Sequence, residues 1–143
     1  MTTLLVKNAD VLVTMDDSRR EIEAGAVLID ENRVAWVGPT AEFEPWLADN
    51  RPDLVRDGFD RVIDARGCVV MPGLINCHHH LSQTLTRTIG TGDGNILFDW
   101  LKFLYPIWAE MTPEAVYVSA RIGLSELILS GCTTVADHLY LYP

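Results

Sequence analysis

The N-terminal half of the chain alternates short apolar, β-branched runs with turn-forming residues. Such runs predict short strands over residues 4–7, 11–14, 26–30, 33–37 and 61–64. The clearest pair lies in GAVLIDENRVAWVG, where two β-branched runs flank Glu31-Asn32 and Asn tolerates the positive φ of a tight hairpin. This spacing predicts an antiparallel β module. The charged stretch of residues 39–60 predicts a surface connection with one short helix around residues 41–48.

From residue 69 the pattern changes to strand, helix and strand. Residues 69–80 are apolar and β-prone up to a row of histidines, and Pro72-Gly73 interrupts them as a bend. A first helix is predicted by apolar residues at helical spacing: Leu97, Trp100, Leu101, Leu104 and Trp108. Thr112-Pro113-Glu114 has the composition of a helix start, and Gly131 that of a helix end.

The second helix carries one predicted apolar stripe, made of Val116, Ala120, Gly123, Leu124 and Leu127. Residues 132–142 then predict the next strand. The resulting β-α-β order is typical of an α/β fold with a parallel sheet. Trp100 and Trp108 are expected to pack in the core, with a position covering the substrate as the alternative.

Composition excludes several classes of function. The chain has 143 residues, 48% of them hydrophobic, and a formal charge of -9. A negative field repels phosphate backbones and anionic lipid, so neither nucleic acid nor a membrane is an expected partner. No apolar run is long enough for a signal peptide or a bilayer span. Three cysteines without a C-x-x-C pair indicate reduced thiols and a cytoplasmic location.

The segment Cys77-His78-His79-His80 is the strongest chemical signal. If the strand is regular, His78 and His80 lie on one face while Cys77 and His79 lie on the other. Two imidazoles can share one zinc or ferrous ion. Spacing alone favours two solvated histidines, but a strand that opens with Pro-Gly and ends in histidines is what a parallel barrel needs to present ligands at its carboxyl face. We therefore predict a metal site, with His79 in a packing or supporting role.

Residues near the histidines could serve a substrate or support a ligand. Gln83 follows the strand, and its amide can both donate to and accept from a heterocyclic amide edge, although a solvated loop glutamine fits the spacing equally well. Arg87 could bind an anionic or carbonyl group or lie on the surface. Asp137-His138 ends the next predicted strand, where a carboxylate could orient a ligand imidazole or form a structural pair. The sequence has no nucleophile elbow, phosphate loop or dinucleotide fingerprint.

Residues 72–80, PGLINCHHH, resemble the P-G-x-[IVF]-[ND]-x-H-x-H segment of the metal-dependent amidohydrolase superfamily, with VIDARGCVVM before it as in that family. Three later stretches resemble the aminohydrolase branch that includes 8-oxoguanine deaminase, guanine deaminase and triazine hydrolases. They are HHHLSQTLTR, LFDWLKFLYPIWAEMTPE and SGCTTVADHLYLYP. The likeness covers the whole chain.

The resemblance implies a (β/α)8 TIM barrel preceded by a small antiparallel β-sandwich module. Residues 1–68 would form the N-terminal part of a composite β-sandwich, and residues 69–143 the first two barrel strands with their intervening helices. It implies one Zn²⁺ per subunit, or Fe²⁺ instead, bound by His78 and His80, with Gln83 contacting the substrate. A homo-oligomer is expected by the same resemblance.

The implied reaction is hydrolytic deamination of an aminopurine or related aminoheterocycle of the 8-oxoguanine or guanine kind. Metal-bound hydroxide would attack the amine-bearing ring carbon, and ammonia would leave. The alternative reactions are those of a triazine-type chlorohydrolase or an N-dealkylating aminohydrolase.

The catalytic acid and base and the remaining metal ligands are expected beyond residue 143, because similar enzymes supply them from later strands. A barrel of this kind takes about 250 residues, and two strands cannot close it. We therefore expect the chain to be the N-terminal part of a longer polypeptide, inactive by itself. A non-catalytic truncated chain is the alternative from another class.

Overall fold

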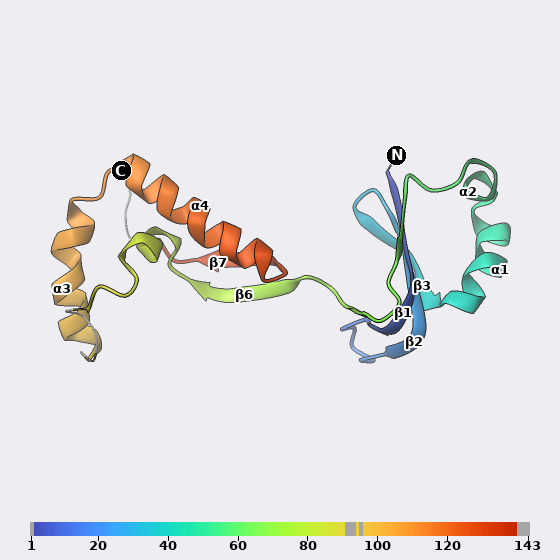
Figure 1. Ribbon diagram of the computed structural model, residues 1–143, viewed down its shortest axis with the longest axis horizontal. Helices are drawn as coiled ribbons and strands as arrows, with labels where there is room; N and C mark the ends of the chain where they lie inside the picture. Colours follow the sequence, from blue (N-terminus) through green and yellow to red (C-terminus); the bar gives the residue numbers. More distant parts are fainter. Residues whose placement is uncertain (1, 91–93, 95, 140–143) are drawn as a thin grey trace. The chain divides into compact units, whose positions relative to one another are not determined.

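The computed structural model describes residues 2–90, 94 and 96–139, and the chain divides into two units, Met1–Pro72 and Gly73–Pro143. The first unit contains one mixed sheet and two helices, and the second contains a pair of strands with helices (Figure 1). Within the described ranges, no helix is long and apolar enough to cross a membrane. The fold is α/β.

The first unit is built on a sheet of five strands. They are β1 (Thr3–Val13), β2 (Glu21–Asp30), β3 (Arg33–Pro39), β4 (Arg61–Asp64) and β5 (Val69–Val70). The first three pair antiparallel in the order β3-β2-β1, whereas β4 and β5 both pair parallel to β1. The prediction of an antiparallel module is therefore wrong for β4, and Val69-Val70, predicted as part of the strand that leads to the histidines, pairs with β1 instead. Helices α1 (Thr40–Asn50) and α2 (Pro52–Asp57) make a crossover after β3, and a crossover of this length lets the chain re-enter the sheet parallel to β1.

Two predicted short strands are one long strand, β1, which bends at a register shift between Val6 and Ala9. Asn8 lies inside the shift with φ 61, a conformation that Asn adopts more readily than most residues. The predicted β2–β3 hairpin is confirmed, with Asp30 opposite Arg33. Its positive φ falls on Glu31 (φ 55) rather than on Asn32.

Helices α1 and α2 cover one face of this sheet (Figure 1). The buried core between the two layers consists of Leu5, Leu28, Phe43, Leu47 and Leu54. Trp36, Trp46 and Phe59 pack against its edge. Strand residues alternate faces, so their neighbours Val6, Val27 and Val37 lie with a second, smaller cluster around Leu12.

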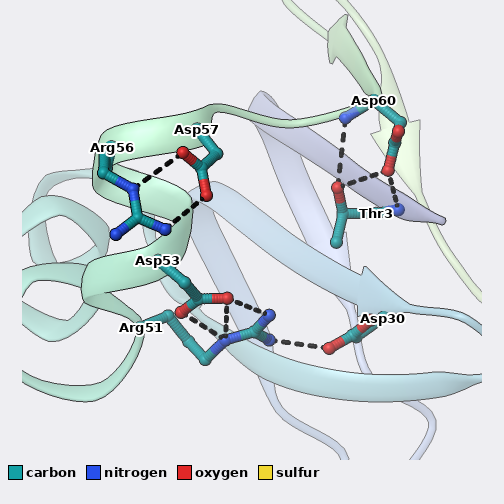
Figure 2. A network of polar contacts seen from close by, with 7 residues as sticks. All are labelled: Thr3, Asp30, Arg51, Asp53, Arg56, Asp57 and Asp60. Atoms are coloured by element: carbon teal, nitrogen blue, oxygen red, sulfur yellow. Dashed lines mark hydrogen bonds and ion pairs between the residues drawn. The ribbon is translucent and has the colours of Figure 1, made fainter. Parts of the chain in front are cut away.

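Figure 2 shows the polar contacts that join α2 and the strand ends. The Arg51 guanidinium bridges Asp30 at the end of β2 (2.7 Å) and Asp53 in α2 (2.8 Å), and it lowers the pKa of the Asp53 carboxyl. Asp60 accepts hydrogen bonds from the Thr3 backbone N–H (2.7 Å) and hydroxyl (2.9 Å). These two bonds hold the pKa of Asp60 below its usual range, because they stabilise the carboxylate. The contacts fix the return of the chain from α2 to β4.

The second unit follows the predicted β-α-β order. Its elements are β6 (Leu74–His79), the 3-10 helix η1 (Leu81–Thr86), α3 (Leu97–Ala109), α4 (Pro113–Leu129) and β7 (Cys132–Asp137). Strands β6 and β7 pair in parallel, and α4 lies alongside them (Figure 1). The Thr112 hydroxyl caps α4 by accepting from Ala115 N (3.2 Å), and Gly131 follows the helix with φ 83, so both predicted ends are confirmed. Part of the predicted last strand, residues 140–142, lies outside the described residues.

Candidate metal centre

The carboxyl end of β6 is not the regular strand that the sequence predicts. Asn76 pairs with Val135 and His79 with Asp137, so β6 holds one residue more than β7 between these points. The Asn76 side-chain oxygen accepts a hydrogen bond from the His78 backbone N–H (3.0 Å), which stabilises the bulge. The prediction of strict alternation is therefore wrong at this point. The His78 and His80 rings nevertheless lie close together in an edge-to-face arrangement, with centroids 5.2 Å apart and planes at 83°.

A backbone carbonyl fixes the orientation of the His80 ring. His80 Nδ1 lies 2.8 Å from the carbonyl oxygen of His138. Because a carbonyl oxygen can only accept, this bond requires the proton on Nδ1, and a neutral ring then carries its lone pair on Nε2. Metal-binding histidines commonly donate their second N–H in this way. The sequence offered the Asp137 carboxylate as one candidate for this supporting role, with a structural pair as the alternative, whereas in the structure the His138 carbonyl makes the contact.

Asp137 and His79 make contacts next to the histidine pair. Asp137 Oδ1 accepts a hydrogen bond from Leu81 N (2.8 Å), the first amide of η1. His79 is half-buried beside α4, and a Cβ added at Gly123 would lie 3.5 Å from its Cε1. Its Nδ1 is buried and has no hydrogen-bond partner among the described residues. Cys77 is exposed.

The donors present fit part of a metal site. Two imidazoles lie together, and imidazole nitrogen is a ligand that zinc and ferrous iron accept. Across residues 2–90, 94 and 96–139, however, no group of three or more His, Cys, Asp and Glu side chains could hold an ion. A catalytic zinc ion usually has three protein ligands. The pair can therefore supply two ligands but not a full set, and the ligand roles of His78 and His80 stay predictions.

Gln83 lies on η1, one turn after His80, and its side chain is half-buried. Its backbone N–H donates to the His80 carbonyl (3.0 Å), and its own carbonyl accepts from the Thr86 hydroxyl (2.9 Å). Trp108 Nε1 in turn donates to the Thr86 hydroxyl (3.0 Å), which connects α3 to η1. The substrate contact predicted for Gln83 stays a prediction, but the backbone that carries it is held in place.

Arg87 and Trp108 make contacts typical of structural residues. Arg87 forms an ion pair with Glu126 of α4, and both side chains are about half exposed, which agrees with the surface alternative. Trp108 is 3% exposed, as expected of a core residue, and packs edge-on against the half-buried Trp100 at 5.6 Å between centroids.

The sequence missed Ser119 of α4. The predicted apolar stripe includes Leu124, which is exposed, whereas the buried residues of the helix are Ser119 and Gly123. These two residues are four positions apart, so they lie on the same face one turn from each other. A serine one turn before a glycine is the signal that could have found this face.

Comparison with known proteins agrees with these features. Residues 69–142 match the sequence profile of the amidohydrolase family. The chain is 55% identical over 80 residues to the 8-oxoguanine deaminase of Pseudomonas aeruginosa, a match that covers 56% of this chain and 18% of that protein. It is 37% identical over 141 residues to the 5'-deoxyadenosine deaminase of Methanosarcina mazei, covering 98% of this chain and 29% of that protein.

The structure is similar to that of atrazine chlorohydrolase from Arthrobacter aurescens, solved in complex with zinc. The identity is 30%, the TM-score is 0.79, and the match covers 98% of this chain and 29% of the other. The chain thus spans less than a third of the length of each of these relatives.

Proposed function

Because the chain belongs to the amidohydrolase family, we propose that it forms part of a metal-dependent hydrolase that releases ammonia from an aminopurine or a related aminoheterocycle of the 8-oxoguanine or guanine kind. The observation that carries this proposal is the His78–His80 ring pair at the end of β6, with the His80 ring held by the His138 carbonyl. Two relatives with deaminase names, one of them an 8-oxoguanine deaminase, support the reaction class.

In this proposal His78 and His80 hold one Zn²⁺, or Fe²⁺ instead, and the His138 carbonyl keeps the His80 ring in the binding orientation. When bound, such an ion supplies Lewis acidity and activates water for attack at a ring carbon. A third protein ligand has to come from outside the pair. The zinc in the similar chlorohydrolase supports the choice of metal.

Gln83 would recognise the heterocycle. Its amide offers one acceptor and two donor hydrogens, which can match the C=O and N–H groups along the edge of an oxopurine. The hydrogen bonds of its backbone to His80 and Thr86 support this role, because they hold the main chain that carries the amide next to His80. A site built to hydrogen-bond such an edge rejects analogues that lack it, because its buried polar groups would be left unpaired.

The rest of the predicted architecture belongs to the same proposal. The parallel β6–α4–β7 arrangement is what the start of a (β/α)8 barrel would contain, and the sheet of the first unit would be one layer of a β-sandwich. We also propose a cytoplasmic homo-oligomeric enzyme. The free cysteines agree with a reducing compartment.

Hydrolysis of a triazine is the second candidate function. The similarity to atrazine chlorohydrolase over nearly the whole chain favours it. The two candidates differ in their products, since a chlorotriazine releases chloride and an aminopurine releases ammonia.

The test is product release by the protein expressed from its complete reading frame and loaded with zinc. We expect ammonia from at least one of 8-oxoguanine, guanine and an adenosine derivative. Gln83→Ala should weaken the binding of that substrate, measured as a rise in KM. Arg87→Ala, which removes a surface ion pair on the same segment, is the matched control and should keep the activity. Chloride release from a chlorotriazine without ammonia from any aminoheterocycle would replace the deaminase proposal with the second candidate.

A further inference from the structure

The 3-10 helix η1 is held against α4 by one buried hydroxyl. Ser119 is fully buried, and its Oγ lies 2.8 Å from the carbonyl oxygens of both Leu81 and Ser82, which share its single hydroxyl proton in a bifurcated hydrogen bond. The same Oγ accepts a hydrogen bond from Leu85 N (3.2 Å). A single side chain therefore satisfies main-chain groups on both sides of Gln83.

The contact depends on a close approach of the two helices. One turn after Ser119, Gly123 is also buried, and a Cβ built on it would lie 2.8 Å from Thr84 Oγ1 and 2.9 Å from Leu81 Cδ2. A larger residue at either position would push η1 away from α4. Serine is neutral to unfavourable inside a helix, because its hydroxyl competes for the helix backbone. Here the hydroxyl instead bonds a different element, which gives a physical reason for a serine in the buried face.

Other groups complete the restraint of η1. Asp137 of β7 accepts from the first amide of η1, Leu81 N. Trp108 of α3 donates to Thr86, which donates to the Gln83 carbonyl. The Gln83 backbone is thus fixed by its surroundings, whereas its side-chain amide forms no hydrogen bond within the described part of the chain.

We propose that Ser119 is a positioning residue of the substrate site, which clamps η1 on α4 so that the Gln83 amide meets the heterocycle in one orientation. The inference rests on the proposed function, because it takes Gln83 as the residue that binds substrate. Ser119 touches no reacting atom, so its loss should weaken the binding of substrate more than the chemical step. Small misplacements of a positioning group are known to have large kinetic effects.

The kinetic test compares Ser119→Ala with Ser125→Ala in the complete, zinc-loaded protein. Ser125 lies on the same helix, and its hydroxyl is exposed and bonds only the Arg121 carbonyl, so it is the matched control. We expect Ser119→Ala to raise KM about 10-fold with kcat within about 3-fold, and Ser125→Ala to leave both within about 2-fold. Ser119→Cys is larger than serine and offers only a weak donor, so it should also raise KM.

A double-mutant cycle tests whether Ser119 acts through Gln83. If it does, Ser119→Ala adds little to KM once Gln83 is already alanine, because contacts that work as a unit are not additive. Full multiplication of the two effects would overturn the proposal. A Ser119→Cys variant with wild-type KM would also overturn it, because it would show that the strong hydroxyl donor is not needed.

Hydrogen exchange separates this inference from the proposed function. Peptides covering residues 81–86 should exchange at least about 10-fold faster in Ser119→Ala and unchanged in Ser125→Ala, because the Leu85 amide loses its acceptor. If no aminoheterocycle is deaminated, or if Gln83→Ala leaves KM unchanged, the proposed function fails. The exchange result then decides the clamp: faster exchange supports it, and unchanged exchange overturns it.

Discussion

Replacing Gly123 with alanine should loosen η1, although alanine is the better helix former. In an exposed helix interior this change stabilises by about 1 kcal/mol. At Gly123 the new Cβ would lie 2.8 Å from Thr84 Oγ1 and 2.9 Å from Leu81 Cδ2, and both of these residues are buried. Overpacking of this kind costs about 1–3 kcal/mol.

The tight contact also involves a hydrogen bond. Thr84 Oγ1 donates to the Leu81 carbonyl (3.0 Å), and turning the hydroxyl away from a new methyl group would break that bond at a cost of about 1 kcal/mol. The gain in helix propensity offsets only part of these losses. We therefore expect a net destabilisation of about 2 kcal/mol for the packing of α4 on η1.

The assay is native-state hydrogen exchange over residues 81–86 and 113–129, because it reports the opening free energy of these segments separately from the first unit. Ser125→Ala, on the exposed side of the same helix, should shift exchange by less than about 0.5 kcal/mol. Slower exchange in Gly123→Ala than in the wild type would refute the close approach of the two helices.

Three further predictions concern the metal, the first sheet and pH. His80→Ala should lower zinc content measured by mass spectrometry to below about a tenth of the wild-type value, whereas Cys77→Ala should leave it unchanged; equal zinc in both variants would remove His80 from the ligands. Gly25→Ala should destabilise the first unit by about 1–3 kcal/mol in urea unfolding, because the new Cβ would lie 2.4 Å from Leu12 Cβ; an unchanged midpoint would contradict the register of β1 and β2. Asp60 has a folded-state pKa below its usual 3.8, so its contribution to stability is present above pH 3.8 and is lost as pH falls through the folded-state pKa. Asp60→Asn should therefore flatten the acid side of the pH–stability curve, and identical curves would rule out this linkage.

Local sequence was a good guide wherever the physical cause is local. The start of α4 follows from the Thr112 hydroxyl and its following proline, and its end from Gly131 with φ 83, because caps act within one turn of the helix. The β2–β3 hairpin likewise follows from two β-branched runs around a two-residue turn. The sequence also identified the histidine pair and the family to which the chain belongs.

The misses have a common cause in contacts between residues far apart in the chain. The parallel pairing of β4 with β1 depends on a crossover through two helices, which the alternation pattern of a short strand does not contain. The bulge before His79 depends on the register with β7. Ser119 reads as a polar interruption of an apolar stripe until η1, distant in sequence, brings the carbonyl groups that bury it.

The sequence by itself determined the order of elements, the caps of α4 and the chemical identity of the two imidazoles, because each of these depends on neighbouring residues. Only the tertiary structure decided how the His80 ring is oriented, since the carbonyl that contacts its Nδ1 belongs to His138, directly after β7. It likewise decided that Ser119 holds the segment carrying Gln83. Hydrogen bonds across elements leave no periodic trace in the sequence, because their geometry exists only after the chain has folded.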